Sequence, residues 1–321
     1  GAAGMIGVKL TRRLIADKAL GGKAIDRLAL VDVVAPTIPA DLPFAATAQA
    51  IDFAAPGVAE ALIAERPEMI FHLAAILSGE AESDFEKGYR INLDGTRYLF
   101  EAIRLAGGGY RPRVVFASSI AVFGAPFPDA IGDEFLQTPL TSYGTQKAIG
   151  ELLLADYTRR GFMDGFGIRL PTLCVRPGKP NGAASGFFSG IIREPLNGEE
   201  APLPVSEDVL HWHTSPRSAV SFLVHAATMD TALLGNRRSL NMPGVSVTVG
   251  GQIAALAKVA GANVAARVRH VPDPVIMKIV AGWPRNFDPQ RALALGFRAE
   301  TSFEDIIRVY IEDELGGTWV A

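Results

Sequence analysis

Two residues four positions apart, Tyr143 and Lys147, have the side chains needed for proton transfer. On a helix, positions i and i+4 share a face, so an ammonium would lie beside a phenol. A phenol titrates near ~10 in water, and a neighbouring cation lowers that pKa because it favours the phenolate. A pKa lower by about 3 units would make Tyr143 a general base at neutral pH. The alternative is an ordinary helix with an exposed lysine.

Two serines, Ser118 and Ser119, end the apolar segment 113–117. A hydroxyl beside Tyr143 could hydrogen-bond the reacting oxygen of a substrate. The alternative is a pair of serines at a strand end that satisfy local backbone groups.

Glycines recur at every third position at the start of the chain, at Gly1, Gly4 and Gly7, directly before a predicted helix over 5–16. Glycine lets the backbone turn sharply and approach a pyrophosphate closely. The N-terminus of the helix offers N–H groups and the positive end of its dipole to an anion. This spacing predicts a phosphate-binding loop.

Acidic residues end the next two predicted strands, 27–31 and 45–51. The carboxylate of Asp32 can accept hydrogen bonds from ribose hydroxyls and repel a 2′-phosphate, which favours NAD over NADP. Asp52 could contact the adenine amino group. For both residues the alternative is a turn aspartate.

His72 ends a predicted strand over 69–73 and precedes small residues that would let the chain pass close under a flat cofactor. We interpret His72 as a core histidine. His211 and His213 flank Trp212, but no cysteine or carboxylate completes a metal-binding set, so we predict no metal.

The elements that must position these residues alternate between strand and helix in the first half of the chain, which is typical of a parallel sheet. We predict helices over 5–16, 56–65, 83–106 and 142–160, and strands over 27–31, 45–51, 69–73, 113–117 and 166–170. After Pro171 we expect a loop over 176–186, helices over 187–196 and 216–228, and strands over 201–205 and 239–242.

The predicted fold class is α/β, a Rossmann-type doubly wound parallel sheet with a smaller C-terminal substrate-binding lobe. We assign residues 1–172 to the NAD-binding domain, to which 211–243 return, and residues 173–210 and 244–321 to the lobe. A βαβ nucleotide-binding unit needs a strand before its loop, and Gly1 begins the loop itself. We therefore expect the sequence to be a fragment that lacks its first strand.

The bulk composition is that of a globular protein: hydrophobic residues make up 49%, charged residues 20%, and the net charge is −3. Such a balance gives no electrostatic footprint for nucleic acid or an anionic membrane. One cysteine, Cys174, rules out an internal disulfide and fits the cytoplasm. No apolar run reaches the ~18 residues of a membrane span, and no signal peptide is visible.

Taken together, these residues resemble the extended short-chain dehydrogenase/reductase superfamily, also called the NAD-dependent epimerase/dehydratase superfamily. The matching segments are the glycine loop, Asp32, 72–75, 92–96, 118–124, the Tyr143/Lys147 pair, 169–172, 288–292 and 295–297. The resemblance implies that Ser119, Tyr143 and Lys147 are catalytic and that Asn92 kinks its helix and supports the site. It also implies a homodimer formed through the helices Ser83 to Ala106 and Ser142 to Arg160.

The resemblance and the motifs together predict the residues that bind NAD and a substrate. The predicted cofactor-binding residues are Gly1, Gly4, Met5, Ile6, Gly7, Asp32, Asp52, Phe53, Leu73, Ala74, Ala75, Asn92, Ser118, Tyr143, Lys147 and Pro171. The predicted substrate-binding residues are Ser78, Ser119, Tyr143, Thr172, Arg176 and Lys179.

Departures from the superfamily's sequence patterns limit the reactions that the chain could catalyse. Nucleotide-sugar dehydratases carry Asp and Glu after the catalytic hydroxyl residue, where this chain has Ile120 and Ala121. Nucleotide-sugar epimerases usually carry Asn at the position of Thr172 and Tyr at that of Phe123. These differences argue against dehydration and against a nucleotide-sugar substrate.

Segments 170–181, 185–195 and 211–217 resemble the D-erythronate dehydrogenases, which oxidise C2 of a four-carbon sugar acid with NAD. A small acid needs a cation for its carboxylate, and Arg176, Lys179 and Arg217 are candidates or else solvated cations. We expect an NAD-dependent, cytoplasmic oxidoreductase that acts on such an acid. The alternatives are a nucleotide-sugar epimerase and a non-catalytic NAD sensor.

Overall fold

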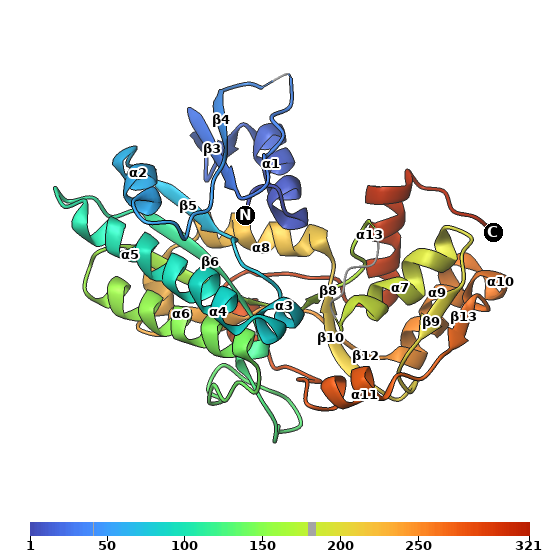
Figure 1. Cartoon of the computed structure of the whole chain (residues 1–321). Helices are drawn as coiled ribbons and strands as arrows, with labels where there is room; N and C mark the ends of the chain where they lie inside the picture. Colours follow the sequence, from blue (N-terminus) through green and yellow to red (C-terminus); the bar gives the residue numbers. More distant parts are fainter. Residues whose placement is uncertain (41, 179–183) are drawn as a thin grey trace. The chain divides into compact units, whose positions relative to one another are not determined.

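The computed structural model describes residues 1–40, 42–178 and 184–321, and the chain divides into two compact units (Figure 1). Unit 1 comprises Gly1–Val122, Thr141–Arg169 and Val220–Leu240, and unit 2 comprises Phe123–Leu140, Leu170–Ala219 and Asn241–Ala321.

Parallel strands form the centre of unit 1. Strand β3 (Arg27–Asp32) pairs in parallel with β4 (Ala45–Ala50), and β5 (Met69–His72) pairs in parallel with β6 (Arg113–Ser119). The sheet that contains β5 and β6 continues through β7 (Asp164–Leu170) to β11 (Ser239–Asn241), in the order β11-β7-β6-β5. The parallel pairing, with helices along the chain between β5 and β6, confirms the predicted α/β class.

Two long helices, α5 (Gly95–Leu105) and α6 (Ser142–Arg159), run side by side in unit 1 (Figure 1). Buried Phe100 of α5, Leu154 of α6 and Phe116 of β6 belong to one hydrophobic cluster. Helix α6 begins where the side chain of Thr141 accepts a hydrogen bond from the N–H of Gly144, a standard N-terminal cap. Packing and capping thus fix the helix that carries Tyr143 and Lys147.

The expected single helix over 83–106 is confirmed from Phe85 to Leu105, where the chain is helical throughout, but it is wrong at Asp84, where the helix is interrupted. The structure has α3 (Ser78–Ser83), α4 (Phe85–Gly88) and a π-helical turn η1 (Tyr89–Asp94) before α5. Asp84 leaves the helical conformation, and its side chain accepts the N–H of Lys87 to cap α4. An aspartate side chain that hydrogen-bonds the backbone of its neighbours can interrupt a helix. The hydrophobic pattern does not show this interruption, so it predicted a helix that continues through Asp84.

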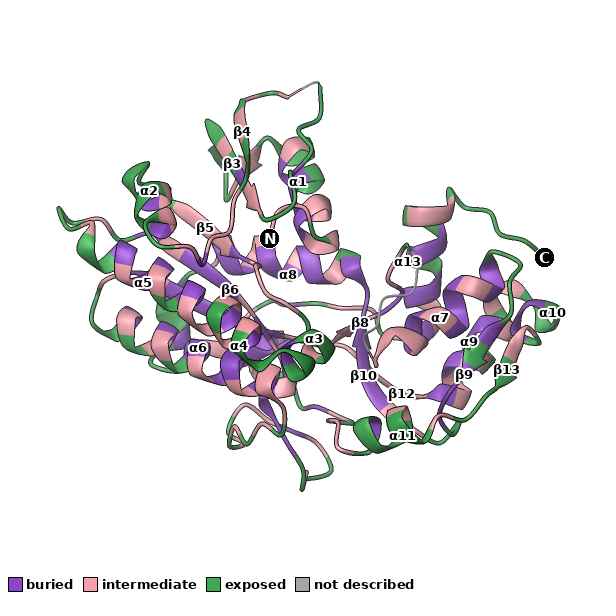
Figure 2. Cartoon of the chain, viewed as in Figure 1, coloured by how far each residue is buried: buried purple, intermediate pink, exposed green. Residues whose placement is uncertain are grey.

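Unit 2 contains a three-stranded sheet in the order β12-β10-β8, formed by β8 (Thr172–Leu173), β10 (Leu210–Thr214) and β12 (Val245–Thr248). Strand β10 is parallel to β8 and antiparallel to β12. Nearly all of β10 is buried (Figure 2). Helices α7 (Gly186–Leu196), α9 (Val249–Ala260) and α13 (Phe303–Leu315) contribute to one hydrophobic cluster of unit 2.

The two units contain further helices and strands. They are α1 (Met5–Asp17), β1 (Ala19–Leu20), β2 (Lys23–Ala24), α2 (Val58–Ala64), η2 (Ile120–Val122), β9 (Ala201–Leu203), α8 (Pro216–Thr228), η3 (Thr231–Leu234), α10 (Ala262–Ala265), β13 (Val268–His270), α11 (Pro274–Ala281) and α12 (Gln290–Ala294). Among the described residues, no helix combines the length and the apolar character that crossing a membrane requires.

Cys174 lies just after β8 in the core of unit 2 and is fully buried. Its thiol donates a hydrogen bond to the carbonyl of Phe188 over 3.2 Å. Burial raises the pKa of this thiol to about 12, so the thiolate does not form at neutral pH.

Candidate active site

Tyr143 lies in the first turn of α6, and its phenol is hydrogen-bonded to the side chain of Ser119, the last residue of β6. The Ser119 hydroxyl oxygen accepts the N–H of Ala121 over 3.1 Å, which leaves its own hydrogen for the phenol. Burial raises the pKa of Tyr143 to about 12, and the bond from Ser119 acts in the opposite direction. The structure therefore brings together two of the three predicted catalytic residues by a direct bond.

Lys147 lies one helical turn further along and is 2% exposed. Its Nζ donates to the carbonyl of Ala117 over 2.9 Å and lies 5.7 Å from the centroid of the Tyr143 ring. Burial lowers the pKa of Lys147 to about 8, although the charge of Glu151 raises it. The predicted proximity is confirmed, but the predicted lowering of the Tyr143 pKa is wrong for this structure, because burial of the phenol dominates.

Behind Lys147 lies a buried ion pair that the sequence analysis did not predict. The carboxylate of Glu151 accepts two hydrogen bonds from Nε of Arg169, at 3.0 and 3.1 Å, and a third from Nη2 at 2.8 Å. It also accepts the hydroxyl of Ser118, a residue predicted to bind the cofactor. The signal in the sequence was the continued spacing of four, since Glu151 follows Lys147 on the same face of α6.

The glycine loop is packed so tightly that two of its glycines have no room for a side chain. A Cβ on Gly7 would lie 2.2 Å from the carbonyl oxygen of Gly1, and one on Gly1 would lie 2.6 Å from the nitrogen of Ala74. A Cβ on Gly4 would meet its nearest atom, the Gly1 oxygen, only at 3.5 Å. Gly4 precedes α1 and no side chain caps the helix, so the N–H groups of its first turn remain for an anion. Met5 and Ile6 belong to this first turn. The loop fits a dinucleotide pyrophosphate.

Asp32 ends β3 beside this loop. Its carboxylate accepts the N–H of Ala3 over 3.0 Å and that of Val34 over 3.1 Å. Partial burial opposes ionisation, yet these N–H donors bring the pKa of Asp32 below its usual value. The side chain is therefore an ionised acceptor next to the phosphate loop, as a ribose-binding carboxylate must be.

Asp52 follows β4. Its carboxylate accepts a hydrogen bond from the N–H of Ala54 over 3.0 Å and forms an ion pair with Arg90 at 2.6 Å. The adjacent Phe53 packs over Gly95, where a Cβ would lie 2.5 Å from the ring. Both residues lie in unit 1 with the loop, and both already have structural partners.

Asn92 holds the segment after β5 by its backbone. Its Oδ1 accepts the N–H of Ile76 over 2.9 Å, while its Nδ2 donates to the Ile76 carbonyl and to Gln146 Oε1. Asn92 lies in the π-helical turn, and its side chain links Ile76, which follows the segment Leu73, Ala74 and Ala75, to Gln146 of α6. Ser78 begins α3, directly after this segment.

His72 is buried, and its Nε2 lies 2.8 Å from the hydroxyl of Thr96. Since Thr96 donates to the Asn92 carbonyl, Nε2 of His72 must donate to Thr96. Burial lowers the pKa of His72 far below its usual value. His72 is thus a neutral core histidine, as interpreted from the sequence.

The remaining predicted substrate residues belong to unit 2. The hydroxyl of Thr172 lies 2.7 Å from Nε2 of His211, whose pKa burial lowers to about 4. Arg176 donates to the Leu173 carbonyl and to Ser185, and no carboxylate of the described residues pairs with it. Lys179 lies outside the described residues, and Pro171 is buried between β7 and β8.

Arg217, the third cation considered for a substrate carboxylate, is held by Glu312 at 3.0 Å and by Asp313. Two carboxylates already balance the charge of Arg217, so Arg176 is the better candidate for binding a substrate carboxylate. Over the described ranges, no group of three or more His, Cys, Asp or Glu side chains is arranged to hold a metal ion.

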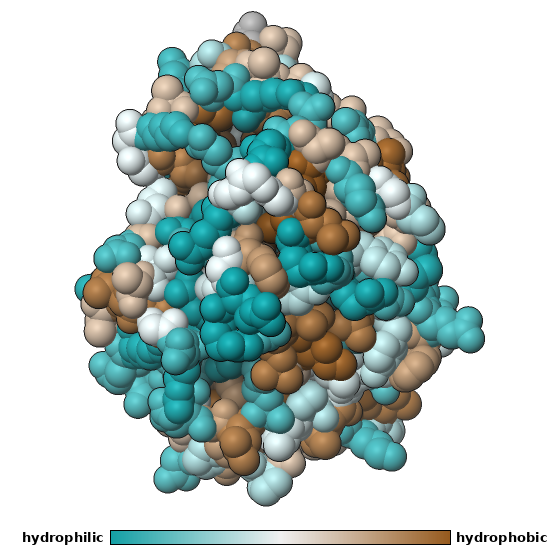
Figure 3. Space-filling model, turned by 90° about the vertical axis from the view of Figure 1, so that its left-hand side faces the viewer, coloured by the Kyte–Doolittle hydropathy of each residue, from teal (hydrophilic) through white to brown (hydrophobic). Residues whose placement is uncertain are grey.

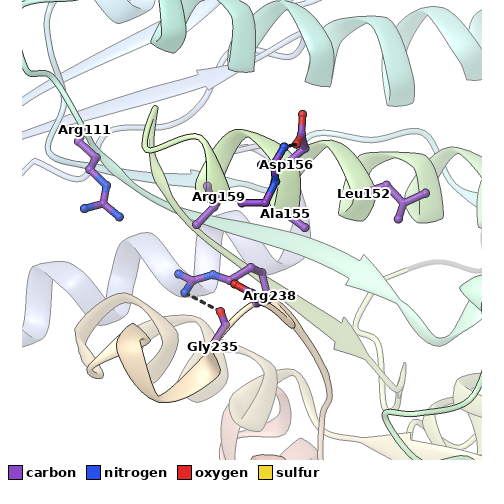
Figure 4. A pocket seen from close by; sticks show the side chains of 9 residues that line it. Arg111, Leu152, Ala155, Asp156, Arg159, Gly235 and Arg238 are labelled. Atoms are coloured by element: carbon purple, nitrogen blue, oxygen red, sulfur yellow. Dashed lines mark hydrogen bonds and ion pairs between the residues drawn. The ribbon is translucent and has the colours of Figure 1, made fainter.

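A surface pocket of about 390 Å³ lies in unit 1 (Figure 4). Its lining includes Asp156 and Arg159 of α6 and Arg238, which donates to the Gly235 carbonyl. Asp156 and Arg159 pair with each other, and Arg238 pairs with Asp164. None of the predicted site residues lines it.

Comparison with known proteins identifies relatives over nearly the whole chain. The chain is 48% identical over 317 residues to a D-erythronate dehydrogenase of Cupriavidus necator, covering 98% of this chain and 97% of that protein. It is 41% identical over 315 residues to a D-erythronate dehydrogenase of Haemophilus influenzae, covering 98% of each. These relatives confirm the resemblance drawn from the sequence.

A solved structure from Agrobacterium tumefaciens, described as a nucleoside-diphosphate-sugar epimerase, is 64% identical. It superposes with a TM-score of 0.97 over 99% of this chain and 94% of that one. The pattern of the NAD dependent epimerase/dehydratase family matches residues 1–221. With the glycine loop, Ser119, Tyr143 and Lys147 in place, the chain belongs to the NAD dependent epimerase/dehydratase family.

Proposed function

We propose that the protein oxidises the C2 hydroxyl of a small sugar acid with NAD, and that its substrate is D-erythronate, which becomes 2-oxo-tetronate. The observation that carries the proposal is near-complete alignment, at 48% and 41% identity, with two D-erythronate dehydrogenases. The Ser119, Tyr143 and Lys147 group supplies the matching chemistry.

In this proposal Tyr143 removes the proton from the C2 hydroxyl. A phenol with a pKa of about 12 is a poor base at neutral pH, so it must ionise while Lys147 keeps its proton. Ser119 donates a hydrogen bond that favours the phenolate, and we propose that its hydroxyl also orients the substrate oxygen.

The glycine loop, the first turn of α1 and Asp32 would hold NAD, which when bound supplies the acceptor for the C2 hydride. The fixed carboxylate of Asp32 disfavours a 2′-phosphate, so we propose NAD and not NADP. The other predicted cofactor residues of unit 1 lie after β4, after β5, in η1, at the end of β6 and in α6, and we propose that they contact NAD.

We propose that Arg176 binds the substrate carboxylate. Its guanidinium has no carboxylate partner among the described residues, whereas Arg217 has two. A planar guanidinium can bind a carboxylate through two parallel hydrogen bonds. Lys179 remains the alternative cation, and Thr172 and Ser78 are proposed to contact substrate hydroxyls.

The second candidate is a nucleotide-sugar epimerase, favoured by the description of the 64% identical Agrobacterium structure. Epimerisation returns the hydride and gives no net NADH. Thr172 and Phe123 stand where such epimerases usually carry Asn and Tyr, which favours the dehydrogenase.

The deciding experiment measures NADH formation with C4 to C6 sugar acids, with NADP in parallel. We expect turnover with NAD and D-erythronate. Tyr110→Phe is a matched control, because the Tyr110 hydroxyl donates to Pro67 away from the site and its loss should leave turnover unchanged. No NADH with any sugar acid, together with epimerisation of a UDP-sugar, would refute the dehydrogenase assignment.

We further propose a homodimer formed through α5 and α6, in the cytoplasm. Each helix exposes an apolar side chain, Leu105 at 64% and Leu152 at 65%. Figure 3 shows hydrophobic patches among hydrophilic side chains on the face at the left of Figure 1. Light scattering should give twice the monomer mass, and Leu152→Glu should reduce it.

A further inference from the structure

The strongest unassigned feature of unit 1 is the buried charge cluster formed by Lys147, Glu151 and Arg169. Their relative exposures are 2%, 4% and 7%. Two cations and one anion leave this interior with a net positive charge. A buried charge is costly unless something compensates it, so the way in which the single carboxylate is shared has consequences for both cations.

The carboxylate is shared unequally. Glu151 makes three hydrogen bonds with Arg169 and one with Ser118, while Lys147 directs its ammonium to the Ala117 carbonyl. Among the described residues, Lys147 forms no ion pair within 4.0 Å, yet the charge of Glu151 still acts on it. Arg169 therefore restrains Glu151 one helical turn from Lys147.

The other groups around Lys147 supply no second anion. His72 on β5 is neutral, Ser119 on β6 is a hydroxyl, and Tyr143 on α6 is protonated in this structure. On the elements packed against α6, Glu82 accepts the N–H of Ser142 and Glu101 accepts the hydroxyl of Tyr157, each at another part of the helix. Glu151 is the one carboxylate among these described neighbours whose charge acts on Lys147.

We propose that Glu151, restrained by Arg169 and Ser118, is a positioning residue that keeps Lys147 protonated beside Tyr143 without pairing with it. This inference rests on the proposed function, because it assigns the phenolate of Tyr143 as the base. A direct pair would neutralise the ammonium that must stabilise the phenolate. Complete loss of the carboxylate would let Lys147 lose its proton too easily.

The proposal has a kinetic signature that a structural role lacks. In the proposed mechanism the loss of one proton is divided between Tyr143 and Lys147, so the two groups titrate as a coupled pair. One proton can leave the pair from Lys147, giving two neutral groups, or from Tyr143, giving the active phenolate and ammonium. Glu151→Gln keeps the size of the side chain but makes the first loss easier. Glu151 follows Tyr143 by eight residues on α6 and Lys147 by only four, so the second loss should change much less than the first.

The test compares kcat of the wild type and Glu151→Gln against pH, between about pH 6 and about pH 10. If Lys147 loses its proton one pH unit earlier, the acidic limb moves down by about one unit and the plateau falls about tenfold. At pH values below the acidic limb, the two proteins should have the same kcat, because the rate there depends only on ionisation of Tyr143. Profiles that are parallel at every pH, or identical, would overturn the proposal.

Two further variants separate this effect from damage to the fold. Arg169→Gln releases the carboxylate toward Lys147, so the acidic limb should move to higher pH, opposite to Glu151→Gln. Asp156→Asn removes an exposed carboxylate from the same helix and should leave the profile unchanged. Shifts of both buried variants in the same direction would contradict the assigned roles.

A measurement without cofactor or substrate distinguishes failure of this inference from failure of the proposed function. Because Lys147 releases its proton more easily when folded than when unfolded, the free energy of unfolding rises once pH exceeds its folded pKa of about 8. In Glu151→Gln this rise should begin about one pH unit lower. An unchanged onset refutes the inference, whatever substrate the enzyme uses.

Discussion

Replacing Lys147 by Met should stabilise the protein at neutral pH while it abolishes turnover. The pKa of Lys147 is about 8 in the folded protein, against 10.5 for a lysine in water. At about 1.4 kcal/mol per pH unit, holding the proton costs the folded state about 3 kcal/mol at neutral pH. The variant also loses the hydrogen bond to the Ala117 carbonyl, worth about 1 kcal/mol. We therefore expect a net gain of about 2 kcal/mol.

The gain in stability of Lys147→Met must depend on pH. The direction of this dependence follows from which state, folded or unfolded, binds the proton more tightly. Between pH 8 and 10.5 the unfolded wild type holds a proton on Lys147 that the folded state has released. The free energy of unfolding of the wild type therefore rises with pH across this window, and that of Lys147→Met does not. The difference between them should shrink and change sign near about pH 10.

Urea unfolding of the cofactor-free proteins at about pH 7 and about pH 10 measures this difference. Burial also raises the pKa values of Cys174 and several tyrosines, but both proteins carry those groups, so their contributions cancel. A variant less stable than the wild type at neutral pH, or a stability difference that does not change with pH, would refute the reasoning.

Four other substitutions test the site. Tyr143→Phe should reduce kcat at least about a hundredfold with little change in the dissociation constant of NAD, measured by fluorescence titration, because the phenol is the proposed base; near-normal turnover would remove Tyr143 from the mechanism. Asp32→Asn should raise the preference for NADP over NAD about tenfold in kcat/KM, because a charge opposing the 2′-phosphate is lost; an unchanged preference would contradict that role. Gly7→Ala should destabilise the protein by about 1–3 kcal/mol, since its Cβ would lie 2.2 Å from a backbone oxygen, whereas Gly4→Ala, with 3.5 Å of room, should leave the unfolding temperature nearly unchanged; equal effects of the two would contradict the packing argument.

The α/β class and the proximity of Tyr143 and Lys147 could be predicted from the sequence, because both depend on local spacing. A four-residue interval on a capped helix fixes Tyr143 and Lys147 on one face, and buried apolar runs fix the parallel strands. The break at Asp84 was missed, because a side chain that caps the next helix looks the same as a polar residue on a helix surface.

The pKa of Tyr143 could not be predicted from spacing. Its direction is decided by how deeply the phenol is buried, which is a property of the packed elements and not of the neighbouring lysine alone. The pairing of Glu151 with Arg169 joins residues 18 positions apart on a helix and a strand, and only the fold brings them together.

The buried thiol of Cys174 makes this chain a convenient background for site-specific labelling. Maleimides and similar reagents attack the thiolate, and a thiol with a pKa of about 12 in a solvent-free position presents almost none. A cysteine introduced at an exposed position would then carry the label alone, with the native residue left in place. A pair of such cysteines, one in each unit, would report the distance between the units by spin or fluorescence spectroscopy, with and without NAD and a sugar acid.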